Sequence, residues 1–430
     1  MTMQHFNYII VALLVILSSC TSNGVISSSF IIQQDGVFYK EGKPYYFIGA
    51  NYWYGPILGS LGQGGNRDRL HSELDFMKAK GITNLRVLVG ADGPSGQKVK
   101  VRPSLQLEPG VYNDTIFDGL DYFLSELGKR DMHAVLYLNN SWEWSGGYGQ
   151  YLNWAGKGDV PPAGVQDWPS FVRHVAQYAD CDSCHTLFKN HIKHVMSRVN
   201  IYSGLRYIDD PSIMSWQIAN EPRAFSDDAK PQFAAWIKDI TAWMRSLDNN
   251  HLISIGSEGS WGCEMDLELF EEIHSDSNVD YLTLHVWPKN WSWIDIEHIP
   301  ESVEVAIEKT NNYVADHVAL AKKMKKPLVI EEFGFPRDNH KYTLDDSVWA
   351  RDRYYENIFN LVLFSFQSKS VIAGCNFWAW GGLGRPENVF WEPWDDYVGD
   401  PAQEEQGLNS VFDTDSTIDV ISKYASMLRQ

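Results

Sequence analysis

Two glutamates stand where the chain passes from a short apolar run into a polar segment. Glu221 lies in Asn220-Glu221-Pro222-Arg223, and Glu332 precedes Phe333-Gly334. A pair of facing carboxyl groups can hydrolyse a glycosidic bond, because one protonates the leaving oxygen while the other attacks the anomeric carbon or activates water. The two roles need opposite protonation states at one pH. Arg86, inside another apolar run, would keep Glu332 ionised if it reached that carboxylate, and Glu221 would then carry the proton.

Most of the other apolar runs also end in residues that suit sugar binding. A single glutamate at such a place is more often a surface residue, and a single histidine is about as often packed in the core. Because many of the apolar runs end in such residues, together they indicate a sugar-binding site. The segments are Asn51-Tyr52-Trp53, Arg86, Asn139-Asn140-Ser141-Trp142, Asn220-Glu221-Pro222-Arg223, His285 with Trp287, Glu331-Glu332-Phe333-Gly334, and Trp378 with Trp380.

Eight short apolar runs alternate with longer segments of helical periodicity. The runs are Phe47–Ala50, Leu85–Val89, Ala134–Leu138, Ile213–Ala219, Leu252–Ile255, Tyr281–Val286, Leu328–Ile330 and Val371–Trp378. Between two of them Leu70, Leu74 and Met77 recur at helical spacing before Gly81, a residue type that often ends helices. Eight strands with intervening helices predict an α/β fold, a (β/α)₈ barrel, whose catalytic groups lie at the carboxyl ends of the strands.

One domain is expected from residue 30 to residue 430, because no internal repeat or Pro/Ser-rich linker interrupts that stretch. A small hairpin is predicted at its start, turning near Asp35-Gly36 and Glu41-Gly42.

Composition limits the classes of ligand. The 430 residues carry a formal net charge of −19, which disfavours nucleic acid and anionic membrane surfaces as partners. A neutral polysaccharide remains compatible. The 17 tryptophans favour one, because the flat apolar face of an indole can stack on a sugar ring, although most of these residues are expected to pack in the core and loops.

The N-terminal residues read as an export signal. Tyr8–Leu17 is an unbroken apolar run, too short to span a bilayer comfortably, and it leads into Ser18-Ser19-Cys20, which resembles a bacterial lipobox. We expect residues 1–19 to be removed, Cys20 to be lipidated and residues 20–29 to form a tether. The protein would then be anchored to a bacterial membrane, periplasmic or at the cell surface. No Lys or Arg precedes the run, so cleavage without lipidation, giving a secreted protein, is the alternative.

Four further cysteines are Cys181, Cys184, Cys263 and Cys375. A disulfide suits an exported protein. It could join Cys181 with Cys184, or either of them with Cys263. Cys375 lies in an apolar run and is expected to be a buried thiol.

These segments resemble glycoside hydrolase family 5, and within it the endo-β-1,4-mannanase subfamily. The resemblance runs from about Phe38 to Val411 and includes the Asn-Glu-Pro triplet that a whole clan of barrels shares. Arg223 and the Asn139-Asn140-Ser141-Trp142 segment are similar to the mannanases in particular. The resemblance implies a retaining enzyme that cuts β-1,4-mannan, galactomannan or glucomannan inside the chain.

The resemblance also implies residue roles. Glu221 would be the acid/base and Glu332 the nucleophile, with Glu331 pointing away from the centre because strand residues alternate faces. Asn220 would bind the 2-hydroxyl of the sugar at the cut site, Arg86 would ionise Glu332, and His285 would fix both carboxyls. Trp378 would stack under the sugar on the non-leaving side. Supporting contacts are assigned to Trp53 and Asn140, and contacts to the leaving side to Trp142 and Arg223. No cofactor or metal is implied, and a monomer is expected.

One departure from the family concerns Trp287, which stands where a Tyr is usual. An indole N–H can donate a hydrogen bond but cannot accept one or ionise, so Glu332 would lose a partner or receive one at another distance.

The segment from Gly381 to Gly407 is rich in acidic residues and Trp. Its acidic residues, among them Asp395, Asp400 and Glu404, are read as solvated charges rather than as a calcium site, and Trp391 and Trp394 could line the cleft. Two other functions stay open: a β-1,4-glucanase on the same barrel, and a sugar-binding lipoprotein without catalysis.

Overall fold

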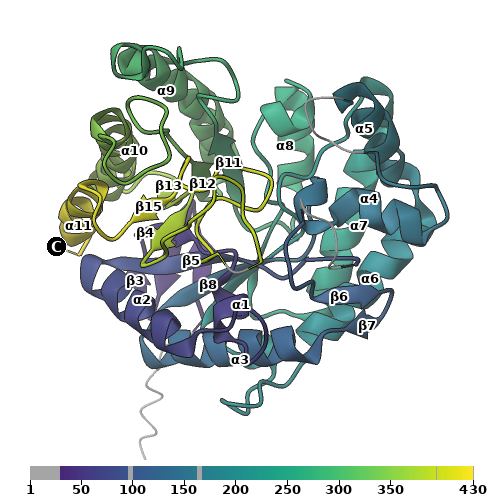
Figure 1. The fold of residues 1–430 in the computed structure, drawn as a ribbon. Helices are drawn as coiled ribbons and strands as arrows, with labels where there is room; N and C mark the ends of the chain where they lie inside the picture. The colour runs from purple at the N-terminus through teal and green to yellow at the C-terminus, as the bar shows by residue number, and fades with distance from the viewer. Residues whose placement is uncertain (1–29, 95–99, 162–166, 394, 430) are drawn as a thin grey trace, which may run out of the picture.

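A computed structural model describes residues 30–94, 100–161, 167–393 and 395–429 (Figure 1). The expected signal peptide of residues 1–19 and tether of residues 20–29 lie outside the described residues, as does Trp394. Within the described part of the chain, none of the helices combines the length and the apolar character needed to cross a membrane.

The eight predicted strands form one parallel sheet. They are β4 (Phe47–Asn51), β5 (Ile82–Leu88), β8 (His133–Tyr137), β9 (Ile213–Gln217), β10 (Leu252–Ser254), β11 (Leu282–Val286), β12 (Leu328–Phe333) and β13 (Ile372–Phe377). Their order is β10-β9-β8-β5-β4-β13-β12-β11. The two end strands are joined by hydrogen bonds from the Asp280 amide to the Ile253 carbonyl at 2.8 Å and from Thr283 Oγ1 to the Ser257 carbonyl at 3.0 Å. The sheet thereby curls into the predicted (β/α)₈ barrel.

Helices surround the strands (Figure 1). They are α1 (Gly55–Gly59), α2 (Arg67–Lys80), α3 (Asp114–Lys129), α4 (Gly147–Trp154), α5 (Trp168–Val175), α6 (Asp182–Met196), α7 (Lys230–Leu247), α8 (Leu267–Ser275), α9 (Ile299–Met324), α10 (Trp349–Ser368) and α11 (Thr417–Met427). The expected end of α2 is confirmed, because Gly81 has a φ of 91° and its amide donates to the last turn. Leu70, Leu74 and Met77 are fully buried on the inner face of this helix.

The hairpin predicted before the barrel is a three-stranded antiparallel sheet of β1 (Ile32–Gln34), β2 (Val37–Lys40) and β3 (Lys43–Pro44). Ile31 and Phe38 pack in a cluster with Phe47, the first residue of β4. The hairpin therefore covers the amino ends of the barrel strands and leaves their carboxyl ends for the site. Two short two-stranded sheets lie outside the barrel sheet. They are β6 (Gln106–Glu108) with β7 (Val111–Tyr112), and β14 (Trp380–Gly382) with β15 (Val411–Phe412).

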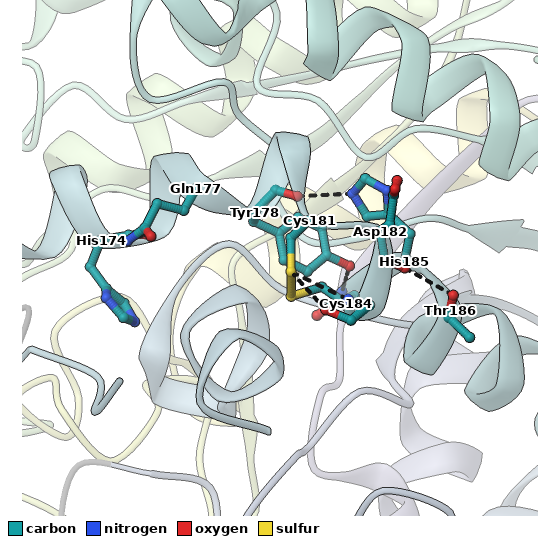
Figure 2. The surroundings of a disulfide bond; sticks show 10 residues. His174, Gln177, Tyr178, Cys181, Asp182, Cys184, His185 and Thr186 are labelled. Atoms are coloured by element: carbon teal, nitrogen blue, oxygen red, sulfur yellow. Dashed lines mark hydrogen bonds between the residues drawn. A yellow bond between two sulfur atoms is a disulfide. The ribbon is translucent and has the colours of Figure 1, made fainter. Parts of the chain in front are cut away.

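Cys181 and Cys184 form a disulfide at the start of α6 (Figure 2). His185 follows it and its Nε2 lies 2.8 Å from the Tyr178 carbonyl oxygen, so that ring is held by the backbone. Cys263 and Cys375 are buried free thiols. Of the pairings that the sequence left open, the structure selects the local one.

We expect the double substitution Cys181→Ser and Cys184→Ser to lower the free energy of unfolding by about 2 kcal/mol, because a three-residue separation closes only a small loop in the unfolded chain. Urea unfolding of the oxidised protein and of the double variant measures the difference. A reducing agent should destabilise the parent protein by a similar amount and leave the double variant unchanged. Equal sensitivity of both proteins to the reductant would contradict this account.

Candidate active site

The two predicted carboxyls meet at the carboxyl end of the barrel. His285, the fourth residue of β11, lies between them: its Nδ1 is 2.8 Å from Glu221 Oε1 and 3.3 Å from Glu332 Oε2. Glu221 follows β9, and its φ of 50° is in the left-handed region, a costly backbone conformation for a residue other than glycine that recurs at active sites. All three side chains are buried. The structure therefore brings His285 into contact with both carboxyls.

Arg86 sits beneath this pair, in β5, and is fully buried. Its Nη1 donates to Glu332 and to Asn51 Oδ1, its Nη2 donates to Asn220 Oδ1 at 2.9 Å, and its Nε donates to Gln217 Oε1 at 2.7 Å. The guanidinium group also lies 4.4 Å from the centre of the Tyr137 ring. The contact between Arg86 and Glu332 that the sequence suggested is therefore present, and the same side chain orients Asn220.

Glu331 does not point away from the centre, so that expectation is wrong. Its Oε2 accepts a hydrogen bond from Gln217 Nε2 at 2.6 Å and lies 3.6 Å from Arg86 Nε. The cause is a bulge in β12, where Leu284 pairs with Ile330 but the next residue, His285, pairs with Glu332. The unpaired Glu331 breaks the alternation of faces, so two consecutive glutamates reach the barrel interior.

The residues after β8 and β9 support Glu221 from one side. The Trp142 indole N–H donates to Glu221 Oε2, and the Arg223 guanidinium lies 5.3 Å from the centre of the Trp142 ring. Asn140 accepts from Asn220 Nδ2 at 3.2 Å and from the Trp142 amide at 3.1 Å, so it positions both neighbours. The structure thus brings these four predicted residues together around the carboxyl of Glu221.

Trp287 donates to Glu221 Oε1 at 3.3 Å rather than to Glu332. Glu332 is instead held by Arg86 and His285. Trp287, the departure from the family pattern, therefore adds a hydrogen-bond donor to Glu221, the acid/base candidate.

We expect Trp287→Phe to raise the pKa of Glu221, because the indole N–H favours the ionised carboxylate and its removal leaves burial and the other partners in place. Loss of one long hydrogen bond should move the alkaline limb of the kcat/KM profile upward by about half a pH unit. Trp291→Phe, on the same loop but with its ring stacked on Trp261, is the matched control. A downward shift in Trp287→Phe would refute the assigned contact.

The remaining predicted aromatic residues differ in their surroundings. Trp378 is buried and lies edge to face with Trp287 and with Trp144, at centroid distances of 6.0 and 6.2 Å. Its indole N–H is buried without a partner in the described structure. Trp53 donates to the Gly399 carbonyl at 2.8 Å and therefore anchors a loop. Trp380 is fully buried in β14, away from solvent.

Burial raises the pKa of Glu332 well above its ordinary value and raises that of Glu221 as well. Arg86 opposes this effect most strongly at Glu332, whereas Arg223 and the Trp142 N–H oppose it at Glu221. Burial also lowers the pKa of His285 well below its ordinary value, so the ring is neutral. Two buried carboxyls this close hold one proton between them near neutral pH. Arg86 donates directly to Glu332 but has no hydrogen bond to Glu221, so we assign the charge of the pair to Glu332 and the proton to Glu221.

The acidic loop after β13 is only partly a set of solvated charges: Asp396 is exposed, but the buried Asp395 and Asp400 correct that interpretation. Asp400 is buried and accepts from the amides of Gly407 at 2.9 Å and Asn409 at 2.9 Å. Asp395 is buried and accepts from Asn388 at 2.9 Å. Trp391 is buried and stacks on Tyr397, so it anchors the loop. These carboxylates organise the loop through its own backbone.

Two functional candidates were missed in the sequence. Glu258 follows β10, and Glu404 lies in the acidic loop with one buried, unpartnered carboxyl oxygen. Burial raises the pKa of Glu404 to about 8, with neighbouring charges that include Asp400 and Glu221. A signal for Glu258 was available, because it lies three residues beyond the fifth apolar run, whose end was assigned no site residue.

A metal ion has one conceivable place among the described residues. Glu221, His285 and Glu332 are the single acidic, histidine or cysteine cluster there whose potential ligand atoms lie within 4.8 Å of one another. The positive charge of Arg86 already lies against Glu332 and opposes a second cation. We therefore assign the cluster no metal.

Comparisons with known proteins give related glycoside hydrolases. A family model described as GH family 5 beta-mannosidase-like matches residues 28–430. Putative mannan endo-1,4-beta-mannosidase 9 of Oryza sativa subsp. japonica is 30% identical over 86% of this chain and 85% of its own length. Mannan endo-1,4-beta-mannosidase 4 of Solanum lycopersicum is 32% identical over 65% of this chain and 67% of its own.

Solved structures give the same fold. A glycoside hydrolase family 5 mannosidase from Rhizomucor miehei, a mutant in complex with mannosyl-fructose, superposes with a TM-score of 0.86 at 35% identity, covering 94% of this chain and 98% of that one. The endo-1,4-beta-mannanase of the same organism superposes with a TM-score of 0.67 at 23% identity, covering 94% of this chain and 100% of that one, a likeness of fold alone.

Proposed function

Because this chain belongs to glycoside hydrolase family 5, we propose that it hydrolyses β-1,4-mannosidic bonds within mannan, galactomannan or glucomannan and retains the configuration of the anomeric carbon. One observation carries the proposal: a carboxyl oxygen of Glu221 and one of Glu332 lie within 4.8 Å of each other. Retaining enzymes need carboxyls about 5–5.5 Å apart, whereas inverting enzymes need about 6.5–9.5 Å to admit a water. The plant relatives named mannan endo-1,4-beta-mannosidase support the substrate class and internal cutting.

The proposed reaction has two displacements. Glu332 attacks the anomeric carbon while Glu221 gives its proton to the leaving glycosidic oxygen, so the C–O bond breaks and a glycosyl ester forms on Glu332. Glu221, now ionised, takes a proton from a water, and that water displaces Glu332 from the sugar. Each displacement inverts the anomeric carbon, so the product keeps the β configuration. The proton distribution set by Arg86 and the neutral His285 suits the first step.

Neighbouring residues complete the proposed sugar site. Asn220, held by Arg86 and Asn140, would bind the 2-hydroxyl of the sugar at the cut site. Trp378 would stack under that sugar, and Trp142 and Arg223 would contact the leaving side.

Two measurements test the proposal. Reducing-end release on linear mannan, galactomannan, carboxymethylcellulose and xylan should favour the mannans, and release mainly from carboxymethylcellulose would make the protein a glucanase. Proton NMR during early hydrolysis of a mannan oligomer should show the β-anomer before mutarotation. The α-anomer appearing first would overturn retention.

Removal of single terminal mannose units is the second candidate function. The description of the family model and the mannosidase from Rhizomucor miehei, which has the higher TM-score of the two enzymes from that organism, favour it. A mannohexaose labelled at its reducing end separates the two: internal cutting gives several labelled lengths at once, whereas terminal cutting gives mannose and a ladder that shortens by one sugar.

We propose further that the protein acts outside the cytoplasm as a monomer. The apolar run Tyr8–Leu17 and the Ser18-Ser19-Cys20 segment support export and lipidation at Cys20 to a bacterial membrane. Mass spectrometry of the mature N-terminus tests this, since an unmodified N-terminus after cleavage would indicate secretion instead. Light scattering of the purified protein tests the monomer.

A further inference from the structure

Glu258 occupies the seam of the barrel, where β10 and β11 lack a continuous ladder. Its carbonyl oxygen accepts from the His285 amide at 3.2 Å and from the Tyr313 hydroxyl at 2.7 Å. The residue is 2% exposed. Its backbone is therefore fixed on two sides, next to the histidine that touches both catalytic carboxyls.

The side chain of Glu258 is committed to Arg223. Arg223 Nε donates to Glu258 Oε2 at 2.6 Å, and Nη2 donates to the same oxygen. Arg223 is two residues beyond Glu221 and lies over Trp142, whose indole donates to Glu221. The ion pair is thus one aromatic ring away from the proposed acid/base, and Arg223 shares the loop of Glu221.

The positive charge of Arg223 affects the protonation of Glu221. Burial raises the pKa of Glu221, and among the effects that lower it the Arg223 charge comes first. An uncompensated cation at this place would favour the carboxylate and remove the proton that the first displacement needs. The charge on Glu258 opposes the charge on Arg223 at short range.

Other groups facing Glu221 do not replace this compensation. They are Arg86 from β5, neutral His285 from β11, Glu332 from β12 and Glu404 from the loop before β15. Arg86 is occupied by Glu332. Glu264 adds a weaker favourable charge beside Arg223, and the carboxylate that Arg223 hydrogen-bonds is Glu258.

We propose that Glu258 is a positioning residue that neutralises Arg223 and thereby keeps Glu221 protonated on the alkaline side of the working range. The inference rests on the proposed roles of Glu221 and Glu332. It is consistent with the titration of Glu258 itself, because burial raises its pKa to about 7. Above that pH Glu258 carries the negative charge that offsets Arg223, on the alkaline side where an acid/base loses its proton.

The test compares alkaline limbs of kcat/KM on a mannan oligomer. Glu258→Gln keeps the shape and an oxygen that can accept from Arg223 but removes the charge. The alkaline limb of this variant should shift to lower pH by about one unit, because a charge a few ångströms away in a partly buried site changes a pKa by about that much. At the pH where the parent keeps half of its maximal kcat/KM, the variant should keep about a tenth of its own maximum.

The double variant Glu258→Gln with Arg223→Met removes both charges, and its limb should return toward that of the parent. Arg223→Met alone should move the limb upward. An ion pair that only stabilises the fold would change unfolding and leave every limb in place, and that outcome overturns the proposal. A limb that stays low in the double variant also overturns it. If Glu258→Gln does not fold, the upward shift in Arg223→Met decides.

A titration without substrate separates this inference from the proposed function. Carbon-13 NMR of the Glu221 carboxyl should show a lower pKa in Glu258→Gln than in the parent, whatever sugar the enzyme cuts. An unchanged pKa overturns the charge balance, whereas failure of the parent to cut any mannan overturns only the proposed substrate.

Discussion

Replacing Glu332 by alanine is expected to lower kcat/KM on mannan by about 10⁴-fold or more, which corresponds to about 5 kcal/mol of lost transition-state stabilisation. The proposed nucleophile is within 4.8 Å of the acid/base and is paired with a fully buried arginine, so removal leaves no group that can form the glycosyl ester. Initial rates on a soluble mannan oligomer measure the loss.

A chemical rescue makes the test specific. The truncated side chain leaves space in which azide can attack the anomeric carbon of an activated aryl β-mannoside, and one displacement should give the α-mannosyl azide. Glu308→Ala, an exposed glutamate on α9, is the matched control and should act like the parent. More than about a hundredth of the parent activity in Glu332→Ala, or a β-mannosyl azide as its product, would contradict the role of Glu332.

The barrel and most of its site could be predicted from the sequence because they depend on local signals. Each buried parallel strand is a short apolar run, and in a barrel every such run ends at the same face. Once the runs are assigned to strands of one barrel, Glu221, His285 and Glu332 must lie at the same end of it. Their spacing in the sequence does not give the distances between them. The end of α2 at Gly81 was predictable for a related reason: a left-handed residue at a helix end selects glycine.

What could not be predicted depends on register and on charge partners. The inward direction of Glu331 follows from one bulge opposite His285, and nothing in Leu328–Ile330 marks the position of that bulge. Asp400 looks like any acidic loop residue until the loop closes back on it and supplies three amides. Pairing of Arg223 with Glu258 crosses from the loop after β9 to the loop after β10, so neither residue reveals it alone.

Trp287 shows the same limit within the resemblance. Its substitution for the usual Tyr was visible in the sequence, and the loss of a partner for Glu332 was a reasonable expectation. In the structure the Trp287 indole N–H donates to Glu221 instead, while Arg86 and His285 contact Glu332. The effect of one side chain on pH dependence therefore needed the geometry of all five residues.

Replacing Glu221 by alanine is expected to lower kcat/KM on mannan by about 10²- to 10⁴-fold, the contribution usual for a positioned general acid and base. The loss should depend on the leaving group. A sugar hydroxyl needs the proton of Glu221, whereas a dinitrophenolate leaves without it, so the first displacement on dinitrophenyl β-mannoside should stay fast. Glycosyl enzyme should then accumulate, because no base activates the water, and a burst of dinitrophenolate followed by a slow steady state should be seen.

The pH dependence and the azide rescue distinguish the proposed role of Glu221 from that of Glu332. Burial raises the pKa of Glu221, so the parent should lose activity on mannan as pH rises through that pKa, and Glu221→Ala should lack this alkaline limb. Azide should attack the accumulated ester on Glu332 and give the β-mannosyl azide, the opposite anomer to that from Glu332→Ala. Equal losses on mannan and on the dinitrophenyl substrate, or an unchanged alkaline limb, would show that the proton comes from another group, with Glu258 and Glu404, whose pKa values are also raised, as candidates.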